Sequence, residues 1–174
     1  IRALAIIKLS CAKVNSKQKI LSNKLSAAIV GASKLVLSGK YDRHFPLSVW
    51  QTGSGTQTNM NVNEVIANLA NKKLTGKLGT NSPVHPNDHV NKSQSTNDSF
   101  PSAINIATAI LVKDSLIPSM KRLQTTLKSH SKKWDKIIKV GRTHLQDATP
   151  LSLGQEFSGY EAMISSNIKR VEQS

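Results

Sequence analysis

The sequence predicts a mainly α protein, and three observations support this prediction. Apolar residues recur at helical spacing in one segment after another. No stretch shows the apolar and polar alternation of a half-buried strand. Aromatic residues make up only 4% of the chain against 38% hydrophobic residues overall, so we expect a core of aliphatic side chains packed between helices.

Polar segments separate the expected helices. The helices share an apolar stripe at helical spacing, and they cover residues 1–14, 16–39, 60–71, 104–134 and 152–174. Gly39 stands where a glycine often ends a helix, and Pro118 is expected to kink the fourth one. Residues 42–46 are expected to form a turn and residues 72–84 a connector.

The 174-residue chain is strongly basic, with a net charge of +14. Such a charge attracts polyanions or small acids over long range, but it does not determine a fold. The lysines are scattered and the few aromatic residues do not interleave with them, so a nucleic-acid site is a weak hypothesis. Solvated helix faces explain the charge better.

Features near the N-terminus exclude several classes of protein. Cys11 is the only cysteine, which rules out an internal disulfide and a zinc site built from thiolates, and a reducing compartment fits. The apolar residues 1–9 are too few for a membrane span, contain Arg2 and Lys8, and precede no cleavage signal. Because the chain begins and ends inside apolar-periodic runs, we expect it to be a piece of a longer protein.

The densest polar stretch is HPNDHVNKSQSTNDSFP, residues 85–101. It runs into an apolar-periodic segment, so Ser95, Thr96, Asn97 and Asp98 are expected at a helix N-terminus, where unpaired N–H groups attract anions. An N-cap followed by a polar turn is the alternative interpretation.

Two further polar clusters strengthen the anion-site hypothesis. In residues 47–59, glycines flank Ser54 and allow the backbone N–H groups to approach a ligand. In GRTHLQDATP, residues 141–150, His144 is the obvious acid or base near neutral pH, although a lone histidine is more often structural. The expected helix 60–71 follows the first of these two clusters. Three of its asparagines are either cross-links between elements or ligand contacts: Asn61, Asn63 and Asn68.

No metal or cofactor is expected. His85 and His89 are four residues apart, as two ligands on one helix face would be, but Pro86 argues against a helix there. Without a third ligand, a hydrogen-bonded pair is the preferred interpretation. Hydroxyl and amide groups suit a substrate with carboxylates that is held by neutral donors and helix ends.

Three blocks together resemble the signature blocks of class II fumarate hydratase, in the fumarase/aspartase superfamily. They are SGTQTNMNVNE at 54–64, HPNDHVNKSQSTND at 85–98 and GRTHLQDATPLSLGQEFSGY at 141–160. The resemblance implies an N-terminal helical domain over residues 1–94, its start missing, followed over residues 95–174 by the first long helices of a central helical bundle. It implies a lyase of the tricarboxylic acid cycle that reversibly adds water to fumarate to give (S)-malate, without metal or cofactor.

The resemblance also implies roles for individual residues. His144 would activate the water together with an acidic partner. The residues implied to bind a substrate carboxylate are Ser54, Gly55, Thr56, Ser95, Thr96, Asn97 and Thr143. The residues implied to form a secondary dicarboxylate site are His85, Pro86, Asn87 and Asp88.

Some positions depart from the family pattern. Thr96 stands where fumarases usually have serine, and STND is common in aspartases, so an aspartase-like ammonia-lyase is the alternative function. His144 favours fumarase, because aspartases have glutamine there. Leu69 stands where an arginine is frequent. A basic helical binding module is a second alternative, supported only by the charge.

The resemblance finally concerns assembly and location. It implies a homotetramer whose active sites are shared between subunits, acting on fumarate and malate, with no nucleic-acid or membrane partner. The location would be cytoplasmic, or mitochondrial in a eukaryote. The family's loop with the catalytic serine would lie beyond Ser174, so we expect the 174-residue chain alone to be inactive.

Overall fold

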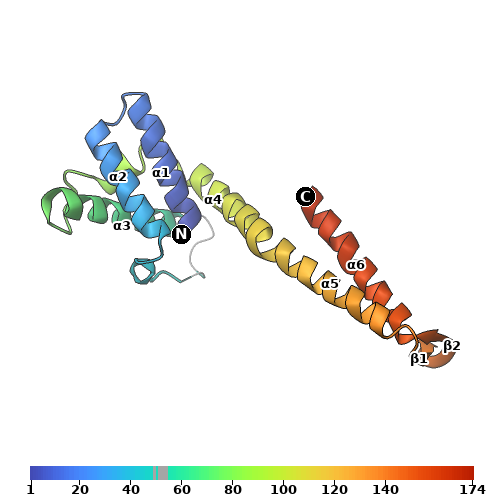
Figure 1. The fold of residues 1–174 in the computed structure, drawn as a ribbon. Coiled ribbons are helices and arrows are strands. Elements are labelled where there is room, and N and C mark those ends of the chain that lie inside the picture. Colours follow the sequence, from blue (N-terminus) through green and yellow to red (C-terminus); the bar gives the residue numbers. More distant parts are fainter. Residues whose placement is uncertain (49, 51–54) are drawn as a thin grey trace. The chain divides into compact units, whose positions relative to one another are not determined.

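The computed structural model describes residues 1–48, 50 and 55–174. The chain divides into two compact units, Ile1–Ala107 and Thr108–Ser174, which are described separately below. Helices dominate both units, so the prediction of a mainly α fold is confirmed (Figure 1). A domain boundary of the complete protein at residue 94 stays a prediction.

The first unit is built around three long helices. They are α1 (Arg2–Lys17), α2 (Asn23–Leu37) and α3 (Thr56–Thr75), accompanied by the 3-10 turn η1 (Asp42–His44), the π-helical turn η2 (Pro86–Val90) and the first part of α4 (Thr96–Leu111). Helices α1 and α2 lie side by side, and α3 packs against α2 (Figure 1). The core is aliphatic, as predicted, with Leu4, Ile29, Val36, Val62 and Ile66 almost fully buried.

Several helix boundaries in this unit differ from the prediction. Helix α1 continues to Lys17, and α2 begins at Asn23 rather than near Ser16. The Ser22 side chain accepts a hydrogen bond from the backbone N–H of Leu25 (3.3 Å) and so caps α2. Helix α3 begins four residues before the predicted Met60 and continues through Thr75, which shortens the expected connector.

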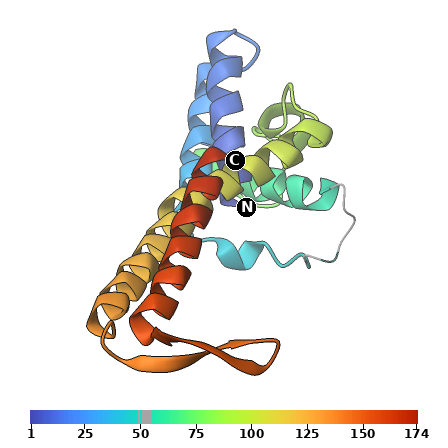
Figure 2. The same cartoon turned by 90° about the vertical axis from the view of Figure 1, so that its right-hand side faces the viewer.

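The second unit is a helical hairpin with a small sheet at its turn. The π-helical turn η3 (Val112–Leu116) leads into α5 (Ile117–Lys133), and the strands β1 (Ile138–Thr143) and β2 (Gln146–Ser152) precede α6 (Leu153–Gln173). Helices α5 and α6 lie side by side (Figure 2). The expected break falls at η3, and Pro118 follows it in the first turn of α5.

The antiparallel β-hairpin is a correction, because the sequence predicted no strand. Ile138 pairs with Ser152 and Thr143 pairs with Gln146, with an irregularity between Val140 and Arg142. Most hairpin side chains are exposed or only half-buried. No buried face therefore imposes the apolar and polar alternation by which a strand is recognised.

The start of α6 is fixed to the end of α5. Ser152 and Gln155 form a reciprocal capping box at the N-terminus of α6. The backbone N–H of Gly154 donates to the Trp134 carbonyl (3.0 Å). The Phe157 ring meets the Trp134 indole edge-on, with ring centroids 4.7 Å apart. These contacts fix the base of the β-hairpin, where β1 begins and β2 ends, to the adjoining ends of α5 and α6.

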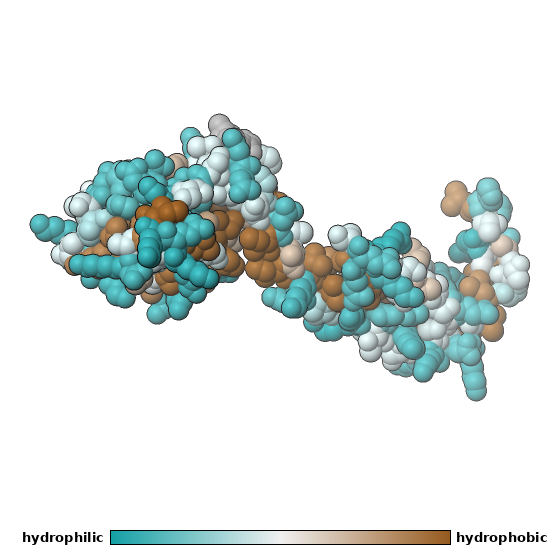
Figure 3. Space-filling view, turned by 90° about the horizontal axis from the view of Figure 1, so that it is seen from above, coloured by the Kyte–Doolittle hydropathy of each residue, from teal (hydrophilic) through white to brown (hydrophobic). Residues whose placement is uncertain are grey.

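Large apolar side chains also lie at the surface (Figure 3). They include Ile104, Leu111, Leu116 and Leu123. Among the described residues, the helical stretch Thr96–Lys133 has the length and composition to cross a membrane, and 6% of its apolar window is buried. Helices of proteins that never enter a membrane meet the same criterion, so this finding does not identify a membrane protein.

Candidate functional site

In the first unit, the starts of α3 and α4 meet. Gly55 precedes α3 with a φ of 70°, in the left-handed region that favours glycine. A Cβ atom at this position would lie 2.3 Å from Cγ of Phe100 in α4. Glycine is therefore required both for the backbone conformation and for the close approach of the two helices.

The predicted start of a helix at the STND sequence is confirmed. The Ser95 carbonyl accepts hydrogen bonds from the N–H groups of Asp98 (3.1 Å) and Ser99 (2.9 Å), and the Ser95 hydroxyl accepts from Asn97 N–H (3.3 Å). The Thr96 hydroxyl accepts from Nδ2 of Asn59 in α3 (2.9 Å). The predicted carboxylate-binding segment is thus held against α3 by a side-chain bond.

A polar network that the sequence analysis missed lies behind this segment. The Nζ atom of Lys8 donates to Oδ1 of Asn91 (2.8 Å) and Oε1 of Gln94 (2.9 Å). Asn91 Oδ1 also accepts from Nδ2 of Asn59 (3.2 Å). Burial lowers the pKa of the Lys8 ammonium to about 8. The sequence carried one signal of this network: Lys8 sits between Leu4 and Ala12 on the buried stripe of α1.

The predicted secondary site lies at η2. Contrary to the expectation from Pro86, this stretch is a helical turn, because proline is compatible with its first position. The Nδ1 atom of His85 accepts from the N–H groups of Asn87 (3.2 Å) and Asp88 (3.1 Å). A ring nitrogen that accepts two N–H groups carries no proton, so its 3.4 Å approach to Oδ2 of Asp88 is not an ion pair.

The two histidines at this turn use their ring nitrogens in hydrogen bonds. Nδ1 of His89 accepts from the backbone N–H of His85 (2.8 Å). Within residues 1–48, 50 and 55–174, no three His, Cys, Asp or Glu side chains are placed to hold a metal ion. The secondary dicarboxylate site itself stays a prediction.

In the second unit, His144 lies at the tip of the hairpin. His144 and Leu145 have positive φ angles of 48° and 62°, as both central residues of a type I′ turn have. Each such non-glycine residue costs about 1–3 kcal/mol, a strain that is typical of functional sites. Thr143 ends β1 directly before this turn, and both predicted site residues are exposed.

An ion pair ties the hairpin to α6. Nζ of Lys139 in β1 lies 2.6 Å from Oε2 of Glu156 in α6, and the Tyr160 hydroxyl donates to Oε1 of the same carboxylate (3.0 Å). The hydrogen bond from Lys139 makes the largest contribution to lowering the pKa of Glu156, and the hydrogen bond from Tyr160 lowers it further. The hydrogen bond to Glu156 raises the pKa of Tyr160. These contacts orient the strand that carries Thr143.

The predicted site residues therefore fall into two groups. The first unit carries Gly55, Thr56, Ser95, Thr96 and Asn97 together with the residues of η2, and the second unit carries Thr143 and His144. Thr56 is exposed at the start of α3, and Asn97 is exposed at the start of α4. Ser54 lies outside the described residues.

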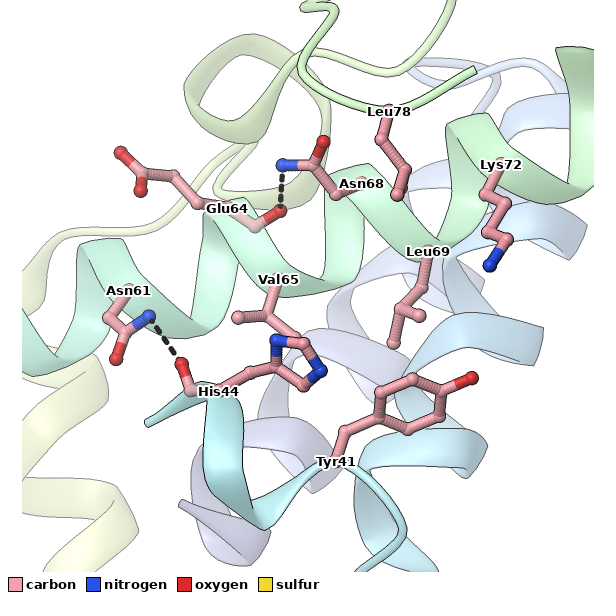
Figure 4. A pocket seen from close by; sticks show the side chains of 9 residues that line it. All are labelled: Tyr41, His44, Asn61, Glu64, Val65, Asn68, Leu69, Lys72 and Leu78. Carbon is pink, nitrogen blue, oxygen red and sulfur yellow. Dashed lines mark hydrogen bonds between the residues drawn. The ribbon is translucent and has the colours of Figure 1, made fainter. Parts of the chain in front are cut away.

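A hollow on the outer face of α3 was not predicted. It encloses about 320 Å³ and is lined by Tyr41, His44, Asn61, Glu64, Val65, Asn68, Leu69, Lys72 and Leu78 (Figure 4). None of the predicted carboxylate-binding residues that the structure describes belongs to it. Leu69, at the position where arginine is frequent in the resembling family, contributes to its apolar wall (Figure 4).

Two of the three asparagines singled out in the sequence, Asn61 and Asn68, cross-link α3 to neighbouring loops. Nδ2 of Asn61 donates to the His44 carbonyl (3.2 Å), and Oδ1 of Asn68 accepts from the Gly79 N–H (2.7 Å). Asn63 is fully buried, and its Oδ1 has no hydrogen-bond partner among the described residues. The first two asparagines thus fix loops against α3.

Comparisons with known proteins agree with one another. A family model described as "Lyase" matches residues 1–174. The chain is 59% identical to the class II fumarate hydratase of Rickettsia conorii over 172 residues, covering 99% of this chain and 37% of that protein. It is 56% identical to that of Wigglesworthia glossinidia brevipalpis over 174 residues, covering 100% of this chain and 38% of that protein.

Solved structures give the same result. The crystal structure of recombinant class II fumarase from Schistosoma mansoni matches with a TM-score of 0.91 and 46% identity, over 97% of this chain and 35% of that one. A fumarate lyase:delta crystallin from Brucella melitensis matches with a TM-score of 0.93 and 40% identity, over 99% of this chain and 40% of that one. The chain thus spans little more than a third of the length of the curated relatives named above.

Proposed function

The chain belongs to the lyase family, and from this membership we propose that it forms part of a class II fumarate hydratase. The reaction would be the reversible addition of water to fumarate to give (S)-malate, a step of the tricarboxylic acid cycle. The observation that carries the proposal is the strained, exposed His144 at the tip of a β-hairpin whose base is fixed to α5 and α6.

Substrate binding would use neutral donors. The N-terminus of α4 offers N–H groups and a positive dipole end, and the Thr96 and Asn97 side chains add donors. Fumarate carries two carboxylates, and negative charge builds up on one of them as water adds. Donors fixed in advance stabilise that developing charge without having to reorganise.

His144 would act on the water. A neutral imidazole accepts a proton from water while the oxygen bonds to one olefinic carbon of fumarate, and a second active-site group, acting as a general acid, donates a proton to the neighbouring carbon. In the reverse direction, the proton beside the carboxylate is removed and the hydroxyl group leaves as water. Thr143 precedes His144 in the chain and would contribute a hydroxyl donor to the carboxylate.

The complete enzyme would be a homotetramer with active sites shared between subunits. Large apolar side chains stand exposed on α4 and α5, and a helical bundle would bury them. We also propose the secondary dicarboxylate site at His85, Pro86, Asn87 and Asp88, and a cytoplasmic location, or a mitochondrial one in a eukaryote.

A hybrid enzyme tests the proposal. Residues 1–174 replace the matching part of the Rickettsia conorii protein, with which they share 59% identity. We expect malate to be converted to fumarate, followed by the ultraviolet absorbance of fumarate, and no conversion by the 174-residue chain alone. Aspartate, the substrate of the ammonia-lyase alternative that Thr96 suggests, should not react. Turnover of aspartate but not malate would reject the hydratase.

A single substitution tests the role of His144 in the same hybrid. His144→Asn should lower kcat by about 10²- to 10⁴-fold, the usual contribution of a positioned acid or base, with a smaller change in KM. Lys136→Gln, at an exposed lysine before the hairpin, is the control and should leave both constants unchanged. An unchanged kcat for His144→Asn would make the histidine structural.

A further inference from the structure

Lys8 is fully buried, which is rare for a lysine. Its ammonium meets the carboxamide oxygens of Asn91 and Gln94 at 2.8 Å and 2.9 Å. Within the described part of the chain, no carboxylate forms an ion pair with Lys8. The charge is therefore held by neutral groups that belong to the segment before α4.

These bonds continue to the predicted substrate-binding residues. Asn91 Oδ1 accepts from Lys8 and from Nδ2 of Asn59, and the same Nδ2 donates to the Thr96 hydroxyl. A hydroxyl that accepts from Asn59 keeps its own proton for another acceptor. Among the residues that the structure describes, the Thr96 hydroxyl donates to no protein atom. It is thus left free to donate to a ligand.

The segment held by Lys8 has a strained backbone. Ser93 has a φ of 60°, which is unfavourable for a residue other than glycine. The carbonyl of the preceding Lys92 accepts from Nδ2 of Asn15 (3.0 Å) and from Nε2 of Gln94 (3.2 Å). Side chains from α1 and from the segment itself therefore maintain a conformation that the backbone alone would leave.

Stability does not explain a lysine at this position. Burial lowers the pKa of Lys8 to about 8, so the charged form is costly to bury at neutral pH. The neighbouring Cys11 thiol, whose own pKa burial raises, gives little compensation. A methionine there would remove this cost, which roughly offsets the loss of the donor to the Gln94 oxygen.

We propose that Lys8 is a positioning residue, which fixes the segment 91–97 through Asn91 and Gln94 so that Thr96 and Asn97 present their donors to a substrate carboxylate. The identity of that substrate rests on the proposed function. The ordering of the segment by Lys8 does not.

Hydrogen exchange of the 174-residue chain tests the ordering. We expect Lys8→Met to accelerate exchange of the Asp98 and Ser99 amides by about tenfold, because the turn before α4 opens more often, while the Ile66 amide in the core keeps its rate or slows. Lys13→Met, at an exposed lysine of the same helix, should change none of these rates. Equal acceleration at Ile66, unchanged rates at Asp98 and Ser99, or failure of Lys8→Met to fold would overturn the proposal.

Kinetics of the hybrid test the consequence for the substrate. Lys8→Met should raise KM for fumarate by about tenfold, the effect of weakening one hydrogen bond to a charged group, and change kcat much less. An unchanged KM in an active hybrid would overturn the positioning role. If the hybrid without the substitution is inactive, the proposed function fails, and the exchange experiment alone decides the role of Lys8.

Discussion

Asn71 of α3 gives the sharpest prediction about stability. It is fully buried, its Nδ2 donates to the carbonyls of Thr80 (2.7 Å) and Val84 (2.9 Å), and its Oδ1 accepts from the N–H of Val84 (2.7 Å). One side chain thus fixes the loop that enters η2. Asn71→Ala removes these bonds and leaves no compensating partner.

The cost follows from the groups left behind. Val84 is fully buried, so both its N–H and its carbonyl lose their hydrogen-bond partners where no water replaces them. Each buried group left unpaired costs about 1–3 kcal/mol, which gives about 4 kcal/mol for the pair. A loss of this size would lower the Tm of a unit of about 100 residues by roughly 15 °C.

Thermal unfolding followed by circular dichroism measures the effect, and hydrogen exchange assigns the transition to the first unit. Asn68→Ala is the matched control, because Asn68 lies one turn earlier on α3 and its bonds are solvent-exposed. It should cost about 1 kcal/mol or less. Equal losses for the two variants would refute the argument that the buried partners of Asn71 set the cost.

Three further predictions concern glycines and pH. Gly55→Ala should cost about 3 kcal/mol, measured by urea unfolding, because its Cβ would strain the left-handed backbone and overlap the Phe100 ring. An unchanged midpoint would contradict this close approach. Gly154→Ala should destabilise the second unit in thermal unfolding, since its Cβ would lie 2.3 Å from a carbonyl oxygen of α5. Gly159→Ala, with open space around it, should be neutral or slightly stabilising in the same experiment. Lys8 has a folded-state pKa of about 8, below its ordinary value near 10.5, so the unfolded chain binds more protons between these values and stability should rise by about 3 kcal/mol from pH 8 to pH 10.5. The rise should be absent in Lys8→Met, and a parallel rise in that variant would assign it to other groups.

The sequence predicted the helices because each has an apolar stripe at helical spacing, which the fold buries in α1, α2 and α3. Val62 and Ile66 lie on one face of α3, and both are fully buried. Helix ends were less predictable, because caps compete with one another locally. Ser16 and Ser22 are both suitable caps, and α2 begins after Ser22.

The hairpin escaped prediction for a physical reason. Its strands bury little on either face, and its turn contains His144 and Leu145 in place of the Asn-Gly or Asp-Gly pair that marks a type I′ turn. Leu145 is 95% exposed, so packing does not account for its positive φ. Local propensity is overridden here, which is the pattern expected where sequence is constrained by function.

The sequence also did not reveal which polar side chains of α3 are buried in the interior. Asn59 and Asn71 lie on the buried face of α3, yet the sequence directed attention to Asn61, Asn63 and Asn68. Of these three, Asn63 is buried, whereas the bonds of Asn61 and Asn68 are solvent-exposed. Composition cannot distinguish these positions, because all five are asparagines in one helix. Only the burial of the facing backbone decides which amide matters for stability.

Two kinds of cost in this chain support the assembly that we propose. Leu111 is 63% exposed and Met163 is 63% exposed, although large aliphatic side chains gain about 1.5–3 kcal/mol on full burial. His144 is strained, yet its ring lies exposed on a hairpin. Both costs would be offset if further helices covered the apolar side chains and a neighbouring surface enclosed the imidazole. A homotetramer with shared active sites would provide both, since helices of a bundle would cover the apolar side chains and a neighbouring subunit would enclose the imidazole.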